Sequence, residues 1–136
     1  MLTVIVVSNK ACLACRLCEV ICSLKHYGEV NPRRSRIRVS FDVWKGVKTI
    51  HVCQHCEEPL CVDKCPNDAL RRDEQTGLIL VDEEKCNGCG VCVSACPYGA
   101  LWLDPIERKP LICDLCGGEP LCISICPVNA LFAGLR

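Results

Sequence analysis

Sixteen cysteines dominate the chemistry that this sequence of 136 residues can support. They fall into four groups of four with none left over, and each group is called a quartet here. Quartet one is Cys12, Cys15, Cys18 and Cys22; quartet two is Cys53, Cys56, Cys61 and Cys65; quartet three is Cys86, Cys89, Cys92 and Cys96; quartet four is Cys113, Cys116, Cys122 and Cys126. Quartet three has the spacing C-x2-C-x2-C-x3-C-P, with which thiolates hold [4Fe–4S] clusters. The sequence therefore predicts that all sixteen cysteines are iron ligands of four [4Fe–4S] clusters.

Zinc and disulfides are the alternative uses of so many cysteines. Zinc sites commonly pair C-x2-C with a distant second pair, whereas four consecutive cysteines followed by proline favour a cluster. A disulfide scaffold belongs to a secreted chain, but residues 1–7 have neither the basic residues nor the small-residue cleavage site of a signal peptide. They are also too few to span a bilayer. We therefore predict a buried first strand there, in a protein of the reducing cytoplasm.

The chain can form only a small hydrophobic core, since it contains only two residues each of Trp, Tyr and Phe. Small domains with thin cores depend on disulfides or metal, so cluster binding would supply folding energy. The formal charge is zero, but each cluster with its four thiolates adds about two negative charges. The run Arg33, Arg34, Arg36 and Arg38 would offset part of this. It predicts either a surface that docks on an acidic partner or a solvated strand edge.

The elements that must position the cysteines can be predicted from the segments around them. Short helices are expected over 16–25, 59–64, 91–95 and 120–125, which places the third and fourth cysteine of each quartet on one helical face. After quartets two, three and four comes Cys-Pro-x-x-Ala-Leu, where proline ends the helix and the chain leaves as a strand. Ser23 replaces this proline in quartet one, which puts the turn there in doubt. Hairpins are expected for 69–72 with 78–81, for 100–103 with 110–112, and for 36–43 with 47–52.

The remaining functional residue types are few. His55 lies between two cysteines, where it either tunes a cluster or is an exposed loop residue. His26 and His51 are expected to be surface or packing residues, and Trp44 and Trp102 to pack in a small core. Backbone amides of the cluster loops are expected to donate to the clusters, namely those of Gly88, Gly90, Gly117 and Gly118. No catalytic constellation is present, and the aromatic interleaving of single-strand nucleic-acid binders is missing.

The fourth cysteine of this motif ligates the neighbouring cluster in two-cluster proteins. This rule predicts four ligand sets: Cys53, Cys56, Cys61 with Cys96; Cys86, Cys89, Cys92 with Cys65; Cys12, Cys15, Cys18 with Cys126; and Cys113, Cys116, Cys122 with Cys22. The sets require quartet two to pair with three and quartet one with four. Spacing alone also permits pairing of quartet one with two and of three with four.

The whole chain resembles the four-cluster polyferredoxin subunits of molybdenum and tungsten enzymes. These are the small subunits of the dimethyl-sulfoxide reductase and formate dehydrogenase groups, and the short forms that accompany tungsten aldehyde oxidoreductases. The resemblance rests on the cysteine motifs and, for the short forms, on segment 22–37. It implies an α+β fold of two nested ferredoxin-like βαβ-type units with quartets paired one–four and two–three. The outer unit would be 1–52 plus 104–136, and the inserted unit 53–103.

The resemblance also implies the function. The chain would be an electron-transfer subunit rather than an enzyme, passing single electrons to or from a large tungsten- or molybdenum-cofactor subunit that oxidises aldehydes. Its second partner would be a flavin- or NAD-linked subunit or a soluble ferredoxin, in the cytoplasm of an anaerobic cell, with no nucleic acid and no membrane span of its own. A free soluble polyferredoxin shuttle is the main alternative, and a zinc-binding structural adaptor is the less favoured one.

Overall fold

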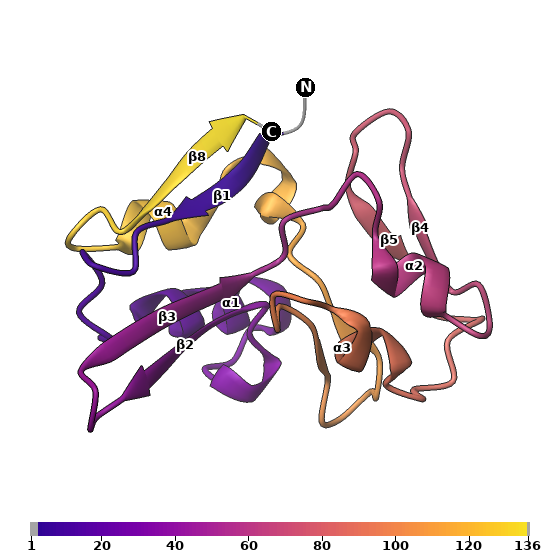
Figure 1. Cartoon of the computed structure of the whole chain (residues 1–136), viewed down its shortest axis with the longest axis horizontal. Coiled ribbons are helices and arrows are strands. Elements are labelled where there is room, and N and C mark those ends of the chain that lie inside the picture. The colour runs from indigo at the N-terminus through magenta and orange to yellow at the C-terminus, as the bar shows by residue number, and fades with distance from the viewer. Residues whose placement is uncertain (1–2, 136) are drawn as a thin grey trace.

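The computed structural model describes residues 3–135. Across these residues, eight short strands form four two-stranded antiparallel sheets, with four α-helices and two short 3-10 helices between them (Figure 1). The 3-10 helices are η1 (Pro32–Arg34) and η2 (Leu115–Gly118). The predicted α+β class is confirmed.

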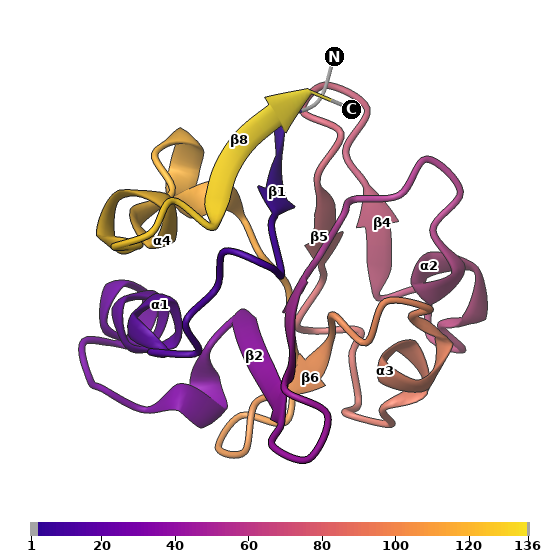
Figure 2. The same cartoon turned by 60° about the vertical axis from the view of Figure 1, so that its left-hand side comes forward.

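The two ends of the chain form one of the sheets. β1 (Thr3–Val7) pairs with β8 (Leu131–Leu135), with Val6 opposite Phe132 (Figures 1 and 2). Val4 and Ile5 are buried, as predicted for a first strand rich in β-branched residues. Met1 and Leu2, which that prediction included, lie outside the described residues. The pairing places the segment after quartet four beside the segment before quartet one.

All four predicted helices form: α1 (Leu17–Tyr27), α2 (Leu60–Lys64), α3 (Val91–Ala95) and α4 (Leu121–Ile125). α1 packs against α4 and α2 packs against α3 (Figure 2). The helices therefore associate in the order in which the quartets were predicted to pair. Within residues 3–135, no helix has the length and apolar character needed to cross a bilayer.

The three predicted hairpins are present. β2 (Ile37–Asp42) pairs with β3 (Val47–Val52), β4 (Leu70–Arg72) with β5 (Ile79–Val81), and β6 (Trp102–Leu103) with β7 (Pro110–Leu111). At the β4–β5 turn, Asp73 accepts from the Thr76 hydroxyl and the Gln75 amide, and Gly77 takes a positive φ of 77°. These are the Asp and Gly functions that favour a tight turn.

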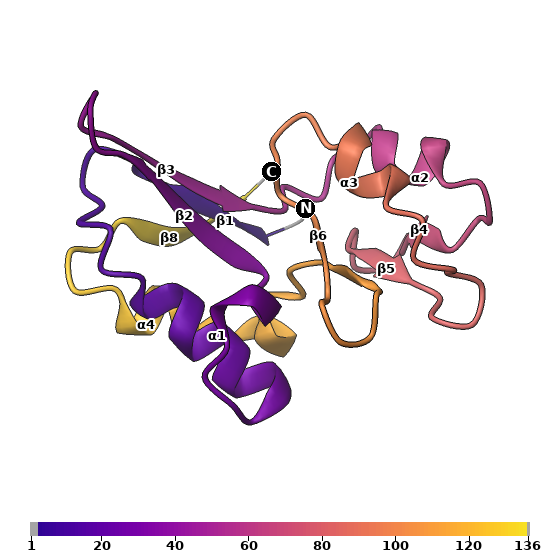
Figure 3. The ribbon, with the colours of Figure 1, turned by 90° about the horizontal axis from the view of Figure 1, so that it is seen from below.

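Two hydrophobic cores lie side by side (Figure 3). The large core is built from β1, β2, β3, β8, α1 and α4, and its buried members are Ile5, Cys12, Cys18, Cys22, Ile37, Val39, Ile50, Val52, Cys113, Leu115, Cys122, Ala130 and Leu131. The small core lies among α2, α3, β4 and β5, and its buried members are Leu70, Ile79, Cys92, Leu101 and Ile112. Cysteines form part of both cores, so the predicted ligands also belong to the packing of the fold.

The two tryptophans have different surroundings. Trp102 is half-buried, and the Arg38 guanidinium lies 4.5 Å from the centre of its ring. Trp44 is 96% exposed at the tip of the β2–β3 hairpin, so the prediction that it packs in a core is wrong. The adjacent Asp42 carboxylate accepts from the Trp44 and Lys45 amides. The residue therefore belongs to a tight turn, with its side chain in solvent.

Candidate metal centres

The structure gathers cysteines from different quartets around common cavities. Three cavities are lined by four cysteines each: Cys65 with Cys86, Cys89 and Cys92; Cys22 with Cys113, Cys116 and Cys122; and Cys126 with Cys12, Cys15 and Cys18. In each cavity, three cysteines come from one quartet and the fourth from another.

The fourth predicted set is also brought together. Burial is the main reason that the pKa of the Cys53 thiol rises to about 12, and the nearby thiols of Cys61, Cys56 and Cys96 contribute to the rise. Burial is also the main reason that the pKa of Cys61 rises, with contributions from Cys96 and Cys56. The members of all four predicted sets are thus neighbours, and all sixteen cysteines are free of disulfides.

Backbone amides point at the sulfur of the first cysteine in three quartets. The residue two positions after that cysteine has positive φ in every quartet: Ala14, His55, Gly88 and Leu115. The amides of the three residues other than glycine lie 3.3 to 3.5 Å from the Sγ atoms of Cys12, Cys53 and Cys113. A left-handed conformation costs a residue other than glycine roughly 1–2 kcal/mol. The strained backbone conformation at these equivalent positions therefore directs an N–H group toward the sulfur.

A second amide serves the fourth cysteine in quartets two, three and four. The amides of Ala69, Ala100 and Ala130 lie 3.3 to 3.5 Å from the sulfurs of Cys65, Cys96 and Cys126. The residue before each alanine has positive φ, which turns the chain so that the amide can donate: Asp68, Gly99 and Asn129. Hydrogen bonds to cluster thiolates help to set the reduction potential of iron–sulfur clusters. The repeat Cys-Pro-x-x-Ala thus forms a thiolate-binding turn.

The four glycines predicted to donate to the clusters all have positive φ. The amide–sulfur hydrogen bonds described above come from other residues, and the Arg36 amide also donates to the Cys22 sulfur. Gly88 also approaches the Arg108 carbonyl so closely that an added Cβ would lie 2.7 Å from its oxygen. Donation from these glycines to a bound cluster stays a prediction.

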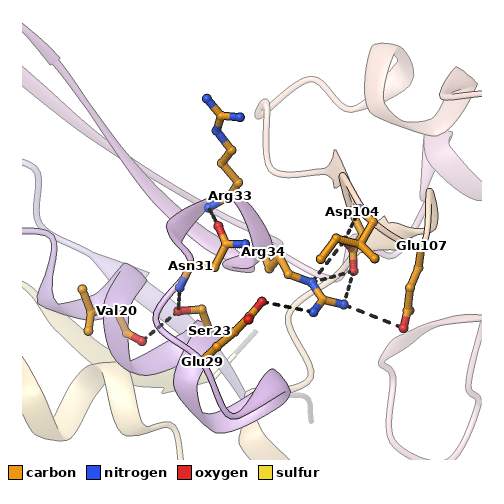
Figure 4. Close-up of polar contacts among 9 residues, drawn as sticks. Val20, Ser23, Glu29, Asn31, Arg33, Arg34, Asp104 and Glu107 are labelled. Atoms are coloured by element: carbon orange, nitrogen blue, oxygen red, sulfur yellow. Dashed lines mark hydrogen bonds and ion pairs between the residues drawn. The ribbon is translucent and has the colours of Figure 1, made fainter.

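Quartet one departs from the repeat at Ser23. Because Ser23 replaces proline, α1 continues past Cys22 to Tyr27, and Gly28 ends it with a φ of 70°. The buried Ser23 hydroxyl donates to the Val20 carbonyl at 2.9 Å and accepts from the Asn31 amide at 3.1 Å (Figure 4). No alanine turn can form, and the amide of Arg36 donates to the Cys22 sulfur at 3.3 Å instead.

His26, one helical turn after Cys22, lies in the wall of the cavity of quartet four. Its Nδ1 is 2.8 Å from the Cys22 carbonyl oxygen and 3.8 Å from the Cys22 sulfur, and its Nε2 is 2.9 Å from Asp114 Oδ1. The bond to Asp114 is the main reason that the pKa of His26 rises to about 10, and it also lowers the pKa of Asp114 to about 2. From the sequence, His26 was predicted to be only a surface or packing residue. The missing proline and the spacing of four from Cys22 were the signals that could have identified it.

His55 is fully buried, so its interpretation as an exposed loop residue is wrong. Its Nδ1 accepts from the Ile79 amide at 3.1 Å and lies 3.8 Å from the Cys53 sulfur. The side chain therefore ties the quartet-two loop to β5. His51 fits its predicted packing role, because it contacts Ser40 and the Tyr98 carbonyl.

The arginine run is only partly at the surface, and Arg34 departs from both surface roles predicted for the run. Arg34 is 8% exposed and binds the buried Asp104 carboxylate through Nε and Nη2, with Glu29 and Glu107 further away (Figure 4). Its guanidinium also lies 3.6 Å from the centre of the Tyr27 ring. Arg36 pairs with Asp114 and is half-buried, as is Arg38, whereas Arg33 is exposed. Sequence patterns do not reveal such pairs, since Asp104 lies 70 residues away.

The donor set fits a thiolate-bound metal cluster. Burial raises the pKa of Cys18 and Cys122 to about 12 and that of Cys92 to about 11. Burial would also raise the pKa of Cys22, but hydrogen bonds from His26 and the Arg36 amide outweigh it and lower the value. Converging sulfurs and amides directed at them are the features that such a group needs. Metal binding must displace protons from the buried thiols.

Comparison with known proteins agrees with this geometry. Residues 47–136 match the family described as "4Fe-4S dicluster domain". The chain is 47% identical over 112 residues to the "Aliphatic sulfonate oxidoreductase, polyferredoxin-like subunit" of Pyrococcus furiosus, covering 82% of this chain and 64% of that protein. It is 36% identical over 102 residues to the "Electron transport protein HydN" of Escherichia coli, covering 71% of this chain and 57% of that protein.

A solved structure of the "Active site complex BamBC of Benzoyl Coenzyme A reductase" has a similar fold, with a TM-score of 0.60 and 31% identity. The match covers 99% of this chain and 80% of that one. The chain spans somewhat more than half the length of the curated relatives that it matches. The chain belongs to the 4Fe-4S dicluster domain family, and its sixteen cysteines are consistent with four [4Fe–4S] clusters.

Proposed function

We propose that this chain is the electron-transfer subunit of an oxidoreductase complex and passes single electrons through four [4Fe–4S] clusters. The observation that carries the proposal is the lining of three cavities, each by three cysteines of one quartet and the fourth cysteine of another. This crossed ligation is what two-cluster ferredoxin motifs use. When bound, the clusters would supply one-electron redox chemistry, and the chain would hold them, shield them and donate hydrogen bonds to their thiolates.

The proposed ligands are the four predicted sets: Cys12, Cys15, Cys18 and Cys126; Cys113, Cys116, Cys122 and Cys22; Cys53, Cys56, Cys61 and Cys96; Cys86, Cys89, Cys92 and Cys65. We also propose the nested division, with 53–103 inserted in a unit made of 1–52 and 104–136. The pairing of β1 with β8, and of α1 with α4, supports it. Two pairs of clusters in one chain would then form a path for electrons.

The catalytic partner that we propose is a tungsten- or molybdenum-cofactor subunit of the aldehyde-oxidising type. Two relatives are named as parts of other oxidoreductases, acting on an aliphatic sulfonate and on benzoyl coenzyme A. The aldehyde assignment rests on the resemblance of segment 22–37 to the short subunits of tungsten enzymes. A flavin- or NAD-linked subunit or a soluble ferredoxin would exchange electrons at the other end, in the cytoplasm.

Iron content tests the cluster assignment. Protein made and purified without oxygen should be brown and carry about sixteen irons per chain, four for each cubane. About eight irons or fewer after full reconstitution would contradict four clusters, and a colourless zinc-loaded protein would contradict all of them. Purification of the native protein tests the partner. A subunit should co-elute with a large metal-cofactor chain, whereas a free shuttle would elute alone.

A further inference from the structure

The cavity of quartet four differs from the others in the charge of its wall. His26, Arg36 and Asp114 line it together with Cys22, Cys113, Cys116 and Cys122. The lining of the cavity that holds Cys65 and Cys86 includes no charged residue. The lining around Cys12 includes Arg16, which is paired with Glu19 at 2.9 Å. Similar cysteine sets are thus placed in different electrostatic surroundings.

The hydrogen-bond partners of His26 determine its charge. Nδ1 lies 2.8 Å from a backbone carbonyl oxygen, and Nε2 lies 2.9 Å from a carboxylate oxygen. Both partners can only accept, whereas a neutral imidazole carries a single N–H. Two donated hydrogen bonds therefore require an imidazolium. His55 shows the opposite arrangement, because its Nδ1 accepts from the Ile79 amide and so carries no proton.

This cation lies against two of the four proposed cluster ligands. Nδ1 is 3.8 Å from the Cys22 sulfur, and the ligand atoms of His26, Asp114 and Cys116 all lie within 4.8 Å of one another. Asp114 carries one negative charge between the two cations, because its other oxygen pairs with Arg36 at 3.3 Å. His26, Arg36 and Asp114 together therefore leave one net positive charge beside this cavity.

The departure at Ser23 is what places the charge there. In quartets two, three and four, the residue four positions after the fourth cysteine is an alanine, and its amide donates to that cysteine. In quartet one, α1 continues, and the equivalent position holds the His26 side chain while the Arg36 amide replaces the alanine amide. The replacement keeps the amide–sulfur hydrogen bond and adds a cation.

We propose that His26 is a tuning residue: an imidazolium, held by two hydrogen-bond acceptors, that raises the reduction potential of the cluster held by Cys113, Cys116, Cys122 and Cys22. The inference rests on the proposed function, since it assumes that a cluster occupies this cavity. Reduction adds a negative charge to the cluster, and a nearby positive charge stabilises the reduced form. The cation also opposes the effect of burying Cys22, Cys113 and Cys122, because burial disfavours added charge.

The test is a redox titration of the holoprotein followed by electron paramagnetic resonance. His26→Gln should lower the potential of one of the four clusters by at least a tenfold change in its reduction equilibrium, about 59 mV for one electron. His26→Lys, which keeps the charge, should restore most of that shift. His51→Gln is the matched control: it removes a histidine that also has two hydrogen-bond partners, neither of which is a proposed ligand. All four of its potentials should equal those of the parent.

Unchanged potentials in a His26→Gln protein that carries about sixteen irons would overturn the proposal. If His26→Gln cannot load this cluster, the His26→Lys protein decides the question. Parental potentials in a loaded His26→Lys protein support the proposal, and a potential lowered by about 59 mV or more overturns it. Nitrogen NMR of the oxidised parent, labelled in its three histidines, gives a separate criterion. Two protonated ring nitrogens are expected on His26, and one bare nitrogen would overturn the cationic state. Low iron in the parent would instead defeat the proposed function.

Discussion

The large core and the small core contain similar cysteine motifs, but they differ in how deeply the cysteines are buried and in the lengths of the surrounding helices and strands. Five of the eight cysteines in quartets one and four are buried, whereas Cys92 is the only buried one in quartets two and three. Around the large core, α1 has eleven residues and β1, β2, β3 and β8 have five or six each. Around the small core, the helices have five residues and the strands of β4 and β5 have three. The small core therefore has less protein packing with which to stay folded without metal.

Iron removal should give the largest difference between the two regions. In apoprotein prepared with a chelator under reducing conditions, we expect amides of α2 and α3 to lose protection from hydrogen exchange. Amides of β1 and β8, which depend on strand pairing, should retain much more protection. The difference should be at least a hundredfold in protection, roughly 3 kcal/mol. Mass-spectrometric exchange on holo- and apoprotein measures it, and equal loss in both regions would contradict the comparison.

Ser23→Pro should disrupt the feature that distinguishes quartet one. Proline inside α1 removes a backbone donor and clashes with the preceding turn, at a cost of about 3 kcal/mol or more. Because Cys22 and His26 would both move, iron should fall from about sixteen to about twelve per chain, the loss of one cubane. The matched control is Pro66→Ser in quartet two, where the chain turns without an extended helix. A Ser23→Pro protein with full iron would show that the extended helix is dispensable.

Asp104→Asn should break the buried ion pair between η1 and the turn that follows β6. Arg34 comes from η1 beside the large core, and Asp104 begins the turn between β6 and β7. Removing one partner of a buried pair typically costs about 3–5 kcal/mol, so the urea midpoint of the holoprotein should fall clearly. Replacing both partners by apolar residues, Arg34→Met with Asp104→Leu, should cost less. Glu84→Gln is the exposed control. Equal midpoints for Asp104→Asn and Glu84→Gln would contradict a structural role for the pair.

Trp44→Ser should have the smallest effect. The side chain is 96% exposed and contributes to neither core, so the free energy of unfolding should change by less than about 0.5 kcal/mol. Leu111→Ala, at a residue that is 2% exposed, should by contrast cost about 2–5 kcal/mol. Urea unfolding of the two variants measures both values. A large loss in Trp44→Ser alone would mean that the hairpin tip is covered in the folded protein.

Local patterns predicted the elements well because proline, glycine and β-branched residues act over short distances. The helices that end at Cys65, Cys96 and Cys126 and the three hairpins follow from such residues. Three of the errors, unlike that for Trp44, came from contacts between distant segments. Arg34 was assigned to the surface because its partner Asp104 lies 70 residues away, and the burial of His55 depends on β5. His26 was missed because its role depends on Asp114, 88 residues away.

The most direct test of the central claim is a crystal structure of the anaerobically purified holoprotein, with iron located by anomalous scattering. The account predicts four cubane sites, each held by three cysteines of one quartet and by the fourth of another, as Cys126 completes the site of Cys12, Cys15 and Cys18. Cystines, single tetrahedral ions, or a cubane held by four cysteines of one quartet would contradict it.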